Sequence, residues 1–504
     1  PAVYSPENVP YVPKHFLPVS MDGVSEGDFT LVFGFPGKTN QYLPSSAIKQ
    51  VLNTLNPAKI GVRETSLKIM DKYMRTDEAT KIKYASKYSK IANYWKKWIG
   101  ESQGLRQSDA IKKKLDYEAA FQKRLSPESP YKGLLADIEK LYMDIDQLTS
   151  AREYYIELVQ NNVELTAYMG TLKRLVNVYE KNGTKGYIEL LPKIKELTSA
   201  FYKDFDSKID REKFGALLNM YVEKLDKKFV PSFLQRENLA MRSDESYDQL
   251  SENQYTLTSF GAEAGAIKFL EYEPSNAVAA IKSDPFFALA AEWAEFYTKE
   301  IANPYNSIRK EIDLKLEMYT KAQMEVFKEK RFYPDANSTM RVTYGKVSGY
   351  QPRDAVDYEP VTYLDGVIEK YIPGDYEFDV PSKMLSLYEA KNFGPYADKT
   401  GKLPVCFIGS NHTTGGNSGS PAIDAHGNLV GLNFDRVWEG TMSDINYDEK
   451  ICRNIMVDVR YILWVIDKFA DAGHLVKEMK LVHPKAKKMI KKKKKAKVAL
   501  KSTI

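Results

Sequence analysis

The chain has 504 residues, of which 43% are hydrophobic and 12% aromatic, and this length is enough for two or three globular domains. No apolar run approaches the roughly 20 residues of a membrane-spanning helix, which excludes a helical membrane protein. Residues 483–504 hold ten Lys and no Asp or Glu, so the net charge is +6 for the whole chain and −4 without this segment. Because no aromatic-interleaved basic patch accompanies the lysines, we expect a disordered tail and no nucleic-acid partner.

The first 44 residues are predicted to form strands and turns. Within residues 28–35, polar and apolar side chains first alternate and are then followed by an apolar run. This segment ends at Pro36-Gly37, a turn signal. From residue 45 to about 330 the apolar spacing becomes three to four residues, which predicts a long α-helical region.

Helix boundaries within this region follow from its apolar stripes and its breakers. One stripe consists of Ile82, Ala85, Tyr88, Ile91, Trp95 and Ile99. A second covers residues 150–180 and closes at Asn182-Gly183, a C-cap signal, after which Pro192 is predicted to open the next helix. Further helices are expected over residues 208–228, 276–302 and 305–330.

At residue 332 the periodicity returns to that of strands. Short β segments with Gly and Pro turns continue to about residue 457, and residues 460–470 predict a closing helix. We therefore expect an α+β fold in which a β-barrel is interrupted by a lid-like helical insertion. The predicted domains are residues 1–44, 45–331, 332–482 and the tail at 483–504.

The most informative motif is the octet at residues 415–422, GGNSGSPA. A serine between glycines, flanked by strands at 405–408 and 429–434, is typical of the nucleophile of chymotrypsin-fold peptidases. Glycines permit the tight turn that exposes the hydroxyl and brings backbone N–H groups together. The octet therefore makes Ser418 the candidate nucleophile, and the alternative is a Gly/Asn-rich surface turn.

The base that such a serine needs is not evident. The chain has five histidines, and His412 and His426 lie in loops beside the serine, too local to stand opposite it. His15, in a Pro-rich stretch, is the alternative base. Together with the start at Pro1, this predicts a fragment that lacks its first barrel and is inactive as given. Cys406 and Cys452 are compatible with one disulfide or with two buried thiols.

Six motifs carry a family resemblance and span residues 1 to about 482. They are GFPGKTN (34–40), IANYWKK (91–97), YPDAN (333–337), MRVTYG (340–345), TGGNSGSP (414–421) and NFDRVWEG (433–440). With these motifs the chain resembles the bacterial dipeptidyl-peptidases of serine peptidase family forty-six, and most closely the acidic-residue-specific members.

The resemblance implies a chymotrypsin-type double β-barrel with an inserted α-helical cap domain, and the release of dipeptides from free N-termini of oligopeptides. It implies that the catalytic His and Asp precede residue 1, that no cofactor or metal is needed, and that the enzyme is a homodimer. It places such enzymes in the periplasm or at the cell surface of Gram-negative bacteria.

The resemblance also assigns roles to single residues. Ser418 would attack the scissile carbonyl, and the backbone N–H groups of Gly416 and Ser418 would form the oxyanion hole. Asn417 stands where many digestive relatives have an Asp that pairs with a newly cut N-terminus in zymogen activation, so no such ion pair is expected. Asp435 and Asn93 would hold the substrate's amine. Without the resemblance, a polar residue such as Asn93 on a helix is usually solvated.

Arg436 sets the expected specificity. On the strand after the nucleophile, its guanidinium would pair with Asp or Glu as the second substrate residue. Without the resemblance, Arg436 would be a surface residue paired with Asp435 or Glu439. The alternative functions are a dipeptidyl-peptidase that prefers apolar residues at this position and a noncatalytic pseudoenzyme or binding module.

Overall fold

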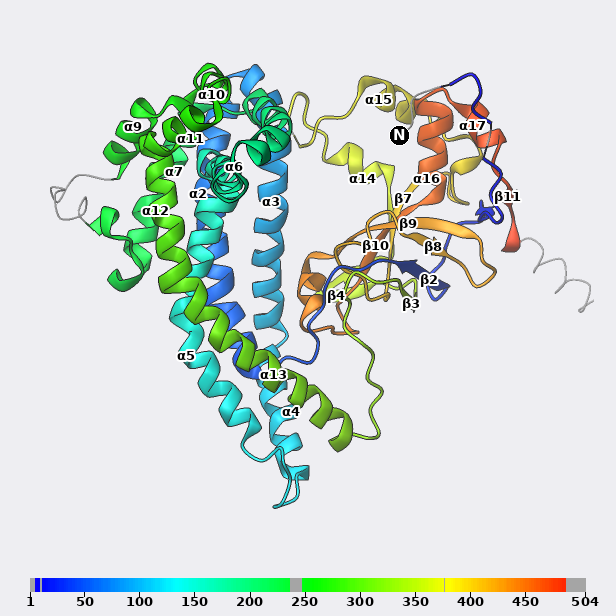
Figure 1. The fold of residues 1–504 in the computed structure, drawn as a ribbon. Coiled ribbons are helices and arrows are strands. Elements are labelled where there is room, and N and C mark those ends of the chain that lie inside the picture. The colour runs from blue at the N-terminus through cyan, green and yellow to red at the C-terminus, as the bar shows by residue number, and fades with distance from the viewer. Residues whose placement is uncertain (1–4, 10, 236–246, 376, 486–504) are drawn as a thin grey trace, which may run out of the picture. The chain divides into compact units, whose positions relative to one another are not determined.

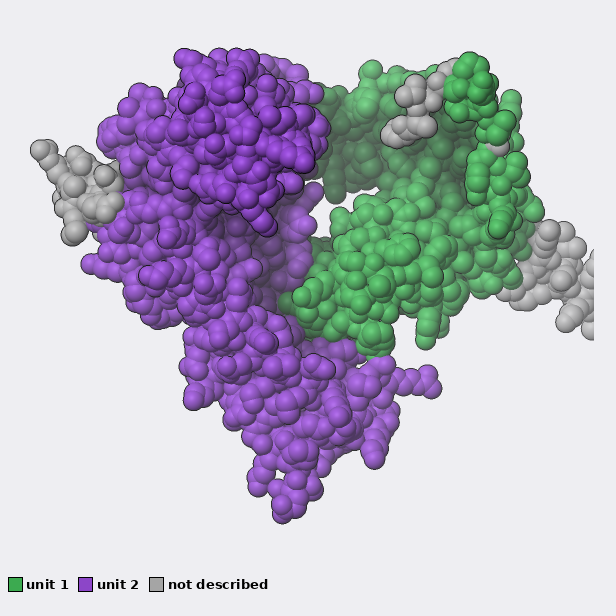
Figure 2. Space-filling model, viewed as in Figure 1, with its two compact units in different colours: residues 1–41, 333–504 green, residues 42–332 purple. Residues whose placement is uncertain are grey.

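The computed structural model describes residues 5–9, 11–235, 247–375 and 377–485. Most of the predicted Lys-rich tail therefore lies outside the described residues. The chain divides into two compact units, one of residues 1–41 and 333–504 and the other of residues 42–332 (Figure 2).

The first unit is built on a nine-stranded sheet, with the strand order β3-β2-β8-β9-β10-β7-β6, and with β1 paired to β9 and β11 paired to β1 (Figure 1). Strand β2 precedes the helical insertion in sequence, yet it pairs antiparallel with β3 and β8, which follow the insertion. The strands are β1 Val19–Ser20, β2 Phe29–Gly34, β3 Arg341–Lys346, β6 Val361–Tyr363, β7 Pro404–Gly409, β8 Pro421–Ile423, β9 Leu429–Arg436, β10 Asn454–Asp458 and β11 Leu481–Val482.

The hairpin predicted after the candidate nucleophile is present. Strands β8 and β9 are antiparallel, and the N–H of Asp424 donates to the carbonyl of Asn428 at 2.9 Å to close the turn. Residues of β2, β7, β8, β9 and β10, with Val347 just after β3, form a hydrophobic core of this unit. These are Val32, Val347, Phe407, Ala422, Val430 and Met456, all at most 3% exposed.

Short helices and a small hairpin complete this unit. Strands β4 (Tyr350–Arg353) and β5 (Val356–Tyr358) form a separate two-stranded sheet. The predicted closing helix is present as α16 (Val459–Trp464), which continues as a π-helical turn, η8 (Val465–Phe469). The other helices are α14 Leu364–Glu369, α15 Ser382–Glu389, η6 Gly394–Tyr396, η7 Trp438–Asp444 and α17 Gly473–Lys477.

The described residues of the second unit form helices joined by turns and loops, with no strand among them. Its main helices are α1 Ser45–Gln50, α2 Asn56–Met74, α3 Glu78–Gln107, α4 Ala110–Arg124, α5 Leu134–Tyr155, α6 Glu164–Lys203, α7 Ser207–Lys224, α9 Asp248–Leu257, α10 Glu263–Leu270, α11 Pro274–Ser283, α12 Pro285–Phe296 and α13 Asn303–Val326. Aromatic residues dominate the core, where Tyr155 stacks on Tyr297 with ring centroids 3.8 Å apart and Trp293 meets Tyr221 edge to face.

Two predicted helix boundaries in this unit are wrong. The helix predicted over residues 150–180 is interrupted by the π-helical segment η2 (Ile156–Asn162) and by extended backbone at Val163. The helix does break at Gly183, where φ is 64°, but Pro192 lies inside the second half of α6 and does not open it. A proline is tolerated in a helix interior when packing compensates the lost hydrogen bond, and sequence alone does not show that packing.

Among the described residues, no helix is long and apolar enough to cross a membrane.

Candidate active site

The turn that carries Ser418 joins β7 to β8. The side chain of Ser418 is exposed, and its hydroxyl donates a hydrogen bond to the carbonyl of Phe434 on β9 at 3.3 Å. This strand runs antiparallel to β8, so the turn is placed directly beside the residues at the end of β9. The serine therefore presents its oxygen to solvent at the edge where Asp435 and Arg436 also lie.

Two glycines shape the turn for a physical reason. Gly416 has φ of +103° and Gly419 has φ of +83°, values that side-chain-bearing residues rarely adopt. A Cβ atom on Gly416 would lie 2.4 Å from the carbonyl oxygen of Phe35. The N–H of Gly37 donates to the carbonyl of Gly415 at 2.6 Å, which holds the turn against the segment after β2.

Buried amide side chains fix the rest of the turn. Asn417 is 3% exposed, and its Oδ1 accepts from the N–H of Thr414 at 3.1 Å. The Nδ2 of Asn433 donates to the carbonyl of Asn417 at 3.3 Å, and the Nδ2 of Asn454 donates to Oδ1 of Asn433 at 2.8 Å. Asn417 therefore has a structural partner within the turn, a role that its sequence position did not reveal.

The backbone N–H groups of Gly416 and Ser418 make no hydrogen bond with any residue that the structure describes. Unpaired N–H groups beside an exposed hydroxyl can stabilise the negative oxygen of a tetrahedral intermediate. The arrangement can therefore support acyl transfer at Ser418, given a base.

None of the five histidines, all of them described, is hydrogen-bonded to the hydroxyl of Ser418. The Nε2 of His412 instead pairs with the carbonyl of Ser443 at 2.9 Å, and its ring packs on that of Tyr447 with centroids 4.5 Å apart. Burial lowers the pKa of His412 below its usual value. His15 is exposed in its extended segment.

Arg436, the last residue of β9, is held by an acidic side chain, Asp444. Its Nη1 lies 2.5 Å from Oδ1 of Asp444 and 2.8 Å from the hydroxyl of Ser443, and its Nη2 lies 3.3 Å from Oδ2 of Asp444. The two charged side chains are only 13% and 12% exposed. Asp444 ends η7, eight positions after Arg436, and no sequence pattern pointed to it.

The partners expected for a surface arginine are engaged elsewhere. The carboxylate of Asp435 accepts from the backbone N–H of Arg436 at 2.8 Å, and that of Glu439 accepts from the hydroxyl of Tyr350 at 2.6 Å. The Nε of Arg436 has no partner among the described residues. One edge of the guanidinium, formed by Nε and Nη2, therefore keeps unpaired donors.

Asp435 and Asn93 belong to different units. Asp435 is exposed next to a register shift between β9 and β10, and Asn93 is exposed on α3 of the helical unit. Each side chain is accessible to a ligand. Their grouping around one substrate amine stays a prediction.

The two cysteines are free thiols, and burial raises the pKa of both Cys406 and Cys452 to about 11. A raised pKa favours the neutral thiol at physiological pH over the thiolate, which is the reactive form. Within the described ranges, no group of three or more His, Cys, Asp or Glu side chains is arranged to hold a metal ion.

Residues 1–481 match the family model described as Peptidase S46. The Asp/Glu-specific dipeptidyl-peptidase of Flavobacterium psychrophilum is 50% identical over 491 residues, which are 97% of this chain and 68% of that protein. The Asp/Glu-specific dipeptidyl-peptidase of Capnocytophaga gingivalis is 46% identical and is matched over 96% of this chain and 67% of its own length. The chain thus spans about two thirds of these relatives.

A solved structure also matches. It is DPP11 of Porphyromonas endodontalis in complex with the dipeptide Arg-Glu, with a TM-score of 0.83, 31% identity, and coverage of 95% of this chain and 68% of that one. The mixed helix and sheet architecture is the one found in that protein. The predicted enzyme class, a serine-type dipeptidyl-peptidase, is confirmed by the family and the relatives. The chain belongs to the Peptidase S46 family.

Proposed function

We propose that this chain forms the substrate-binding and nucleophile-bearing part of a dipeptidyl-peptidase that releases N-terminal dipeptides ending in Asp or Glu. The observation that carries the proposal is the position of Arg436. Arg436 is the last residue of β9, and the carbonyl of Phe434 on the same strand accepts the hydrogen bond of the Ser418 hydroxyl. The guanidinium therefore belongs to a residue only two positions after the one that contacts the candidate nucleophile. The names of the two relatives and the dipeptide complex of DPP11 support the same specificity.

Arg436 would bind the acidic side chain through its unpaired edge. Asp444 occupies Nη1 and one side of Nη2, which fixes the plane of the guanidinium in a poorly solvated place. The Nε and the remaining Nη2 hydrogen form a second pair of parallel donors, the geometry that a carboxylate accepts. The substrate carboxylate therefore need not displace Asp444.

In the reaction, Ser418 attacks the carbonyl carbon of the second residue, and the N–H groups of Gly416 and Ser418 stabilise the oxygen that becomes negative. One such donor contributes about 3–4 kcal/mol to the transition state. The ammonium of the substrate is held by Asp435 and Asn93, which sets the distance from the free terminus to the cut bond.

We also propose that the general base and its carboxylate lie outside these 504 residues. Within the described part of the chain, the hydroxyl of Ser418 hydrogen-bonds to a backbone carbonyl alone, and the ring of His412 is engaged with Ser443 and Tyr447. We propose in addition that the fold is a chymotrypsin-type double β-barrel in which residues 45–331 are an inserted cap domain. The enzyme would act as a homodimer in the periplasm or at the cell surface.

The test is a panel of fluorogenic dipeptide substrates that differ only in the second residue, assayed with the chain alone and with its natural flanking sequence. We expect activity only with the flanking sequence, and a preference for Asp and Glu over Leu and Phe. A preference for Leu or Phe would reject the acidic specificity and favour the apolar alternative. Activity of the chain alone would reject the external base.

The role of Arg436 is tested with Arg436→Gly. Removing one partner of a poorly solvated charge pair costs about 2–5 kcal/mol, so kcat/KM for acidic substrates should fall by about 30-fold to several thousand-fold. Activity on apolar substrates should fall less or rise. Arg353→Gly, an exposed arginine on β4, is the matched control and should leave the preference unchanged. An unchanged preference in Arg436→Gly would remove Arg436 from the pocket.

A further inference from the structure

The first unit contains a polar cavity of about 520 Å³ whose lining does not include Ser418, Asp435 or Arg436. All of its lining residues belong to residues 1–41 and 333–504, so the cavity lies within one compact unit. Its walls are the segment after β2, the chain that leads into β3, β3 itself, the loop after β7 and the loop after η7.

One wall of the cavity carries a cation that no carboxylate neutralises. Arg341, the first residue of β3, makes no ion pair among the described residues. Its Nη2 donates to the carbonyl of Asp335 at 3.2 Å and to Oδ1 of Asn337 at 3.0 Å, which holds the guanidinium in place. Its Nε is buried, but its Nη1 is accessible and has no partner within the described ranges. Arg341 therefore keeps its charge and one donor group for a ligand.

The loop after β7 brings two hydroxyl groups to the same cavity. Thr413 and Thr414 are only 3% and 9% exposed, and both line the cavity. Each hydroxyl is accessible and has no hydrogen-bond partner in the part of the chain that the structure describes. Polar groups on side chains this deeply buried normally have a partner, so the two hydroxyls indicate a ligand.

The loop after η7 adds an anion and completes the charge balance. Glu449 is exposed, lines the cavity, and has a carboxylate without a partner among the described residues. The cavity therefore has one unpaired cation and one unpaired anion. Tyr333 and Tyr344, which also line it, are 51% and 74% exposed and offer apolar ring surface.

A free dipeptide matches these groups. It carries one carboxylate and one ammonium, and two extended residues span about 7 Å, which suits a cavity of this volume. An inorganic anion would leave Glu449 unpaired, and a simple amine would leave Arg341 unpaired.

We propose that this cavity binds a free dipeptide as a zwitterion. The carboxylate accepts hydrogen bonds from Nη1 of Arg341 and from the two threonine hydroxyls, the ammonium pairs with Glu449, and an apolar side chain packs on the tyrosine rings. The bound carboxylate also restrains the loop that leads to Ser418. Free dipeptides are what the proposed reaction releases, and only this link to the reaction rests on the proposed function.

The probe is leucyl-alanine, titrated into the 504-residue protein by isothermal titration calorimetry. Its alanine offers a specificity pocket neither an acidic nor a large apolar side chain. Acetyl-leucyl-alanine keeps only the carboxylate, leucyl-alanine amide keeps only the ammonium, and the doubly blocked dipeptide keeps neither. We expect saturable binding of leucyl-alanine, weaker binding of the two singly blocked forms, and none of the doubly blocked form.

Variants assign each end of the ligand to a side chain. Arg341→Gln and Thr413→Val should each weaken leucyl-alanine binding about tenfold or more, the effect of one charge-assisted hydrogen bond, and should not change the binding of the amide. Glu449→Gln should weaken leucyl-alanine binding by up to about fivefold and should not change that of the acetylated form. Because Glu449 is exposed, its variant tests the site without risk to the fold. Arg353→Gln on β4 is the matched control and should change nothing.

Several results would overturn the proposal. They are the absence of saturable binding, equal affinity for leucyl-alanine and its doubly blocked form, and equal effects of Arg341→Gln and Arg353→Gln. Loss of binding in Arg436→Gly would overturn it too, because the ligand would then occupy the proposed active site. Binding that persists in Arg436→Gly supports this cavity even if the substrate panel rejects the proposed function.

Discussion

The Ser418 turn and the junction between η2, α6 and α7 hold irregular backbone by opposite means. The turn uses positive-φ glycines and neutral amides, namely Asn417, Asn433 and Asn454. The junction uses full charges that are almost completely buried, with Asp210 at 0% and Lys213 at 1% exposure.

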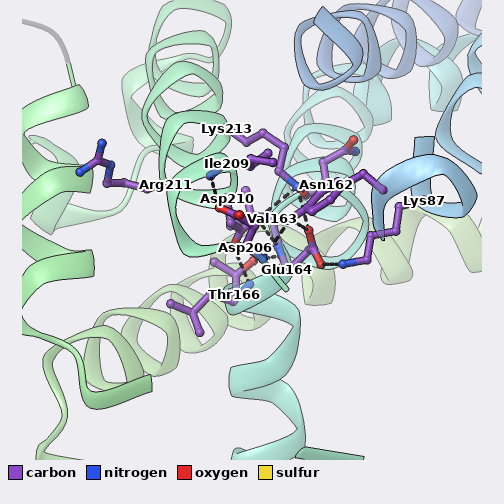
Figure 3. Close-up of polar contacts among 12 residues, drawn as sticks. Lys87, Asn162, Val163, Glu164, Thr166, Asp206, Ile209, Asp210, Arg211 and Lys213 are labelled. Carbon is purple, nitrogen blue, oxygen red and sulfur yellow. Dashed lines mark hydrogen bonds and ion pairs between the residues drawn. The ribbon is translucent and has the colours of Figure 1, made fainter. Parts of the chain in front are cut away.

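The difference follows from what each place must leave free. At the turn, a buried charge near Ser418 would compete for the two N–H groups that can stabilise an anion, whereas neutral amides fix the backbone without occupying them. At the junction, Asp210 accepts from two backbone N–H groups and Lys213 donates to a carbonyl (Figure 3), so these backbone groups are paired within the chain. Neutral amide side chains therefore suit a turn whose N–H groups must stay free for a substrate, and buried ion pairs suit a helix junction with a structural role.

The largest effect that this comparison predicts is on activity at the turn. Ser418→Ala, in the protein with its natural flanking sequence, should lower kcat by about 10⁶-fold, because removal of a serine nucleophile alone costs about as much as removal of a whole triad. The free energy of unfolding should change little, since the Ser418 side chain is exposed. Ser386→Ala on α15 is the control. Substantial residual hydrolysis in Ser418→Ala would show that the nucleophile lies elsewhere.

At the junction the large effect should be on stability. Asp210→Ala leaves Lys213 buried without its nearest carboxylate and should lower the free energy of unfolding by about 3–5 kcal/mol. Burial alone lowers the pKa of Lys213, but Asp210 and Glu164 raise it above its usual value, so the ammonium stays charged. Urea unfolding followed by circular dichroism measures the loss.

The control for this prediction removes both charges together. Asp210→Ala combined with Lys213→Met should be less destabilised than Asp210→Ala alone, because no uncompensated charge is left in the interior. Asp210→Asn should fall between them, since an amide oxygen still caps one N–H of α6. If the double variant loses as much as the sum of the single changes, the network is not energetically coupled.

The smallest predicted effect is on the pH dependence of the unfolding free energy. It concerns His412, a titratable residue near the Ser418 turn. Burial lowers its pKa in the folded state, so the unfolded chain binds more protons below about pH 6.5. Its contribution to stability is therefore complete above that pH and is lost as pH falls toward the lowered folded pKa. The loss cannot exceed about 1.4 kcal/mol per pH unit.

His412→Gln keeps a donor for the carbonyl of Ser443 but cannot titrate. Urea unfolding between pH 7 and pH 5 should show a shallower decline of the unfolding free energy for this variant than for the parent protein. His426→Gln, in the exposed turn between β8 and β9, is the control and should keep the parent slope. Identical slopes for His412→Gln and the parent would show that His412 does not sense pH.

The sequence predicted much of the local structure and less of the packing. The β8–β9 hairpin and the break at Gly183 follow from turn signals, and both are present. The apolar stripe on α3 was only partly right. Ile91 is buried, but Ile82 is 74% exposed and Tyr84 is fully buried, with its hydroxyl donating to Glu164. Periodicity marks a helical face within about one residue, and a hydrogen bond across helices decides which residue turns inward.

The Ser418 turn, the strand and helix periodicities and the family could be predicted from the amino-acid order. The turn and the periodicities depend on neighbouring residues, where glycine φ values and apolar spacing leave few choices. The contact between Asp444 and Arg436, and the presence of Arg341 and Thr413 on one cavity, follow from the folded chain. Such pairs join elements whose approach depends on the packing of the whole unit, and no local pattern records it.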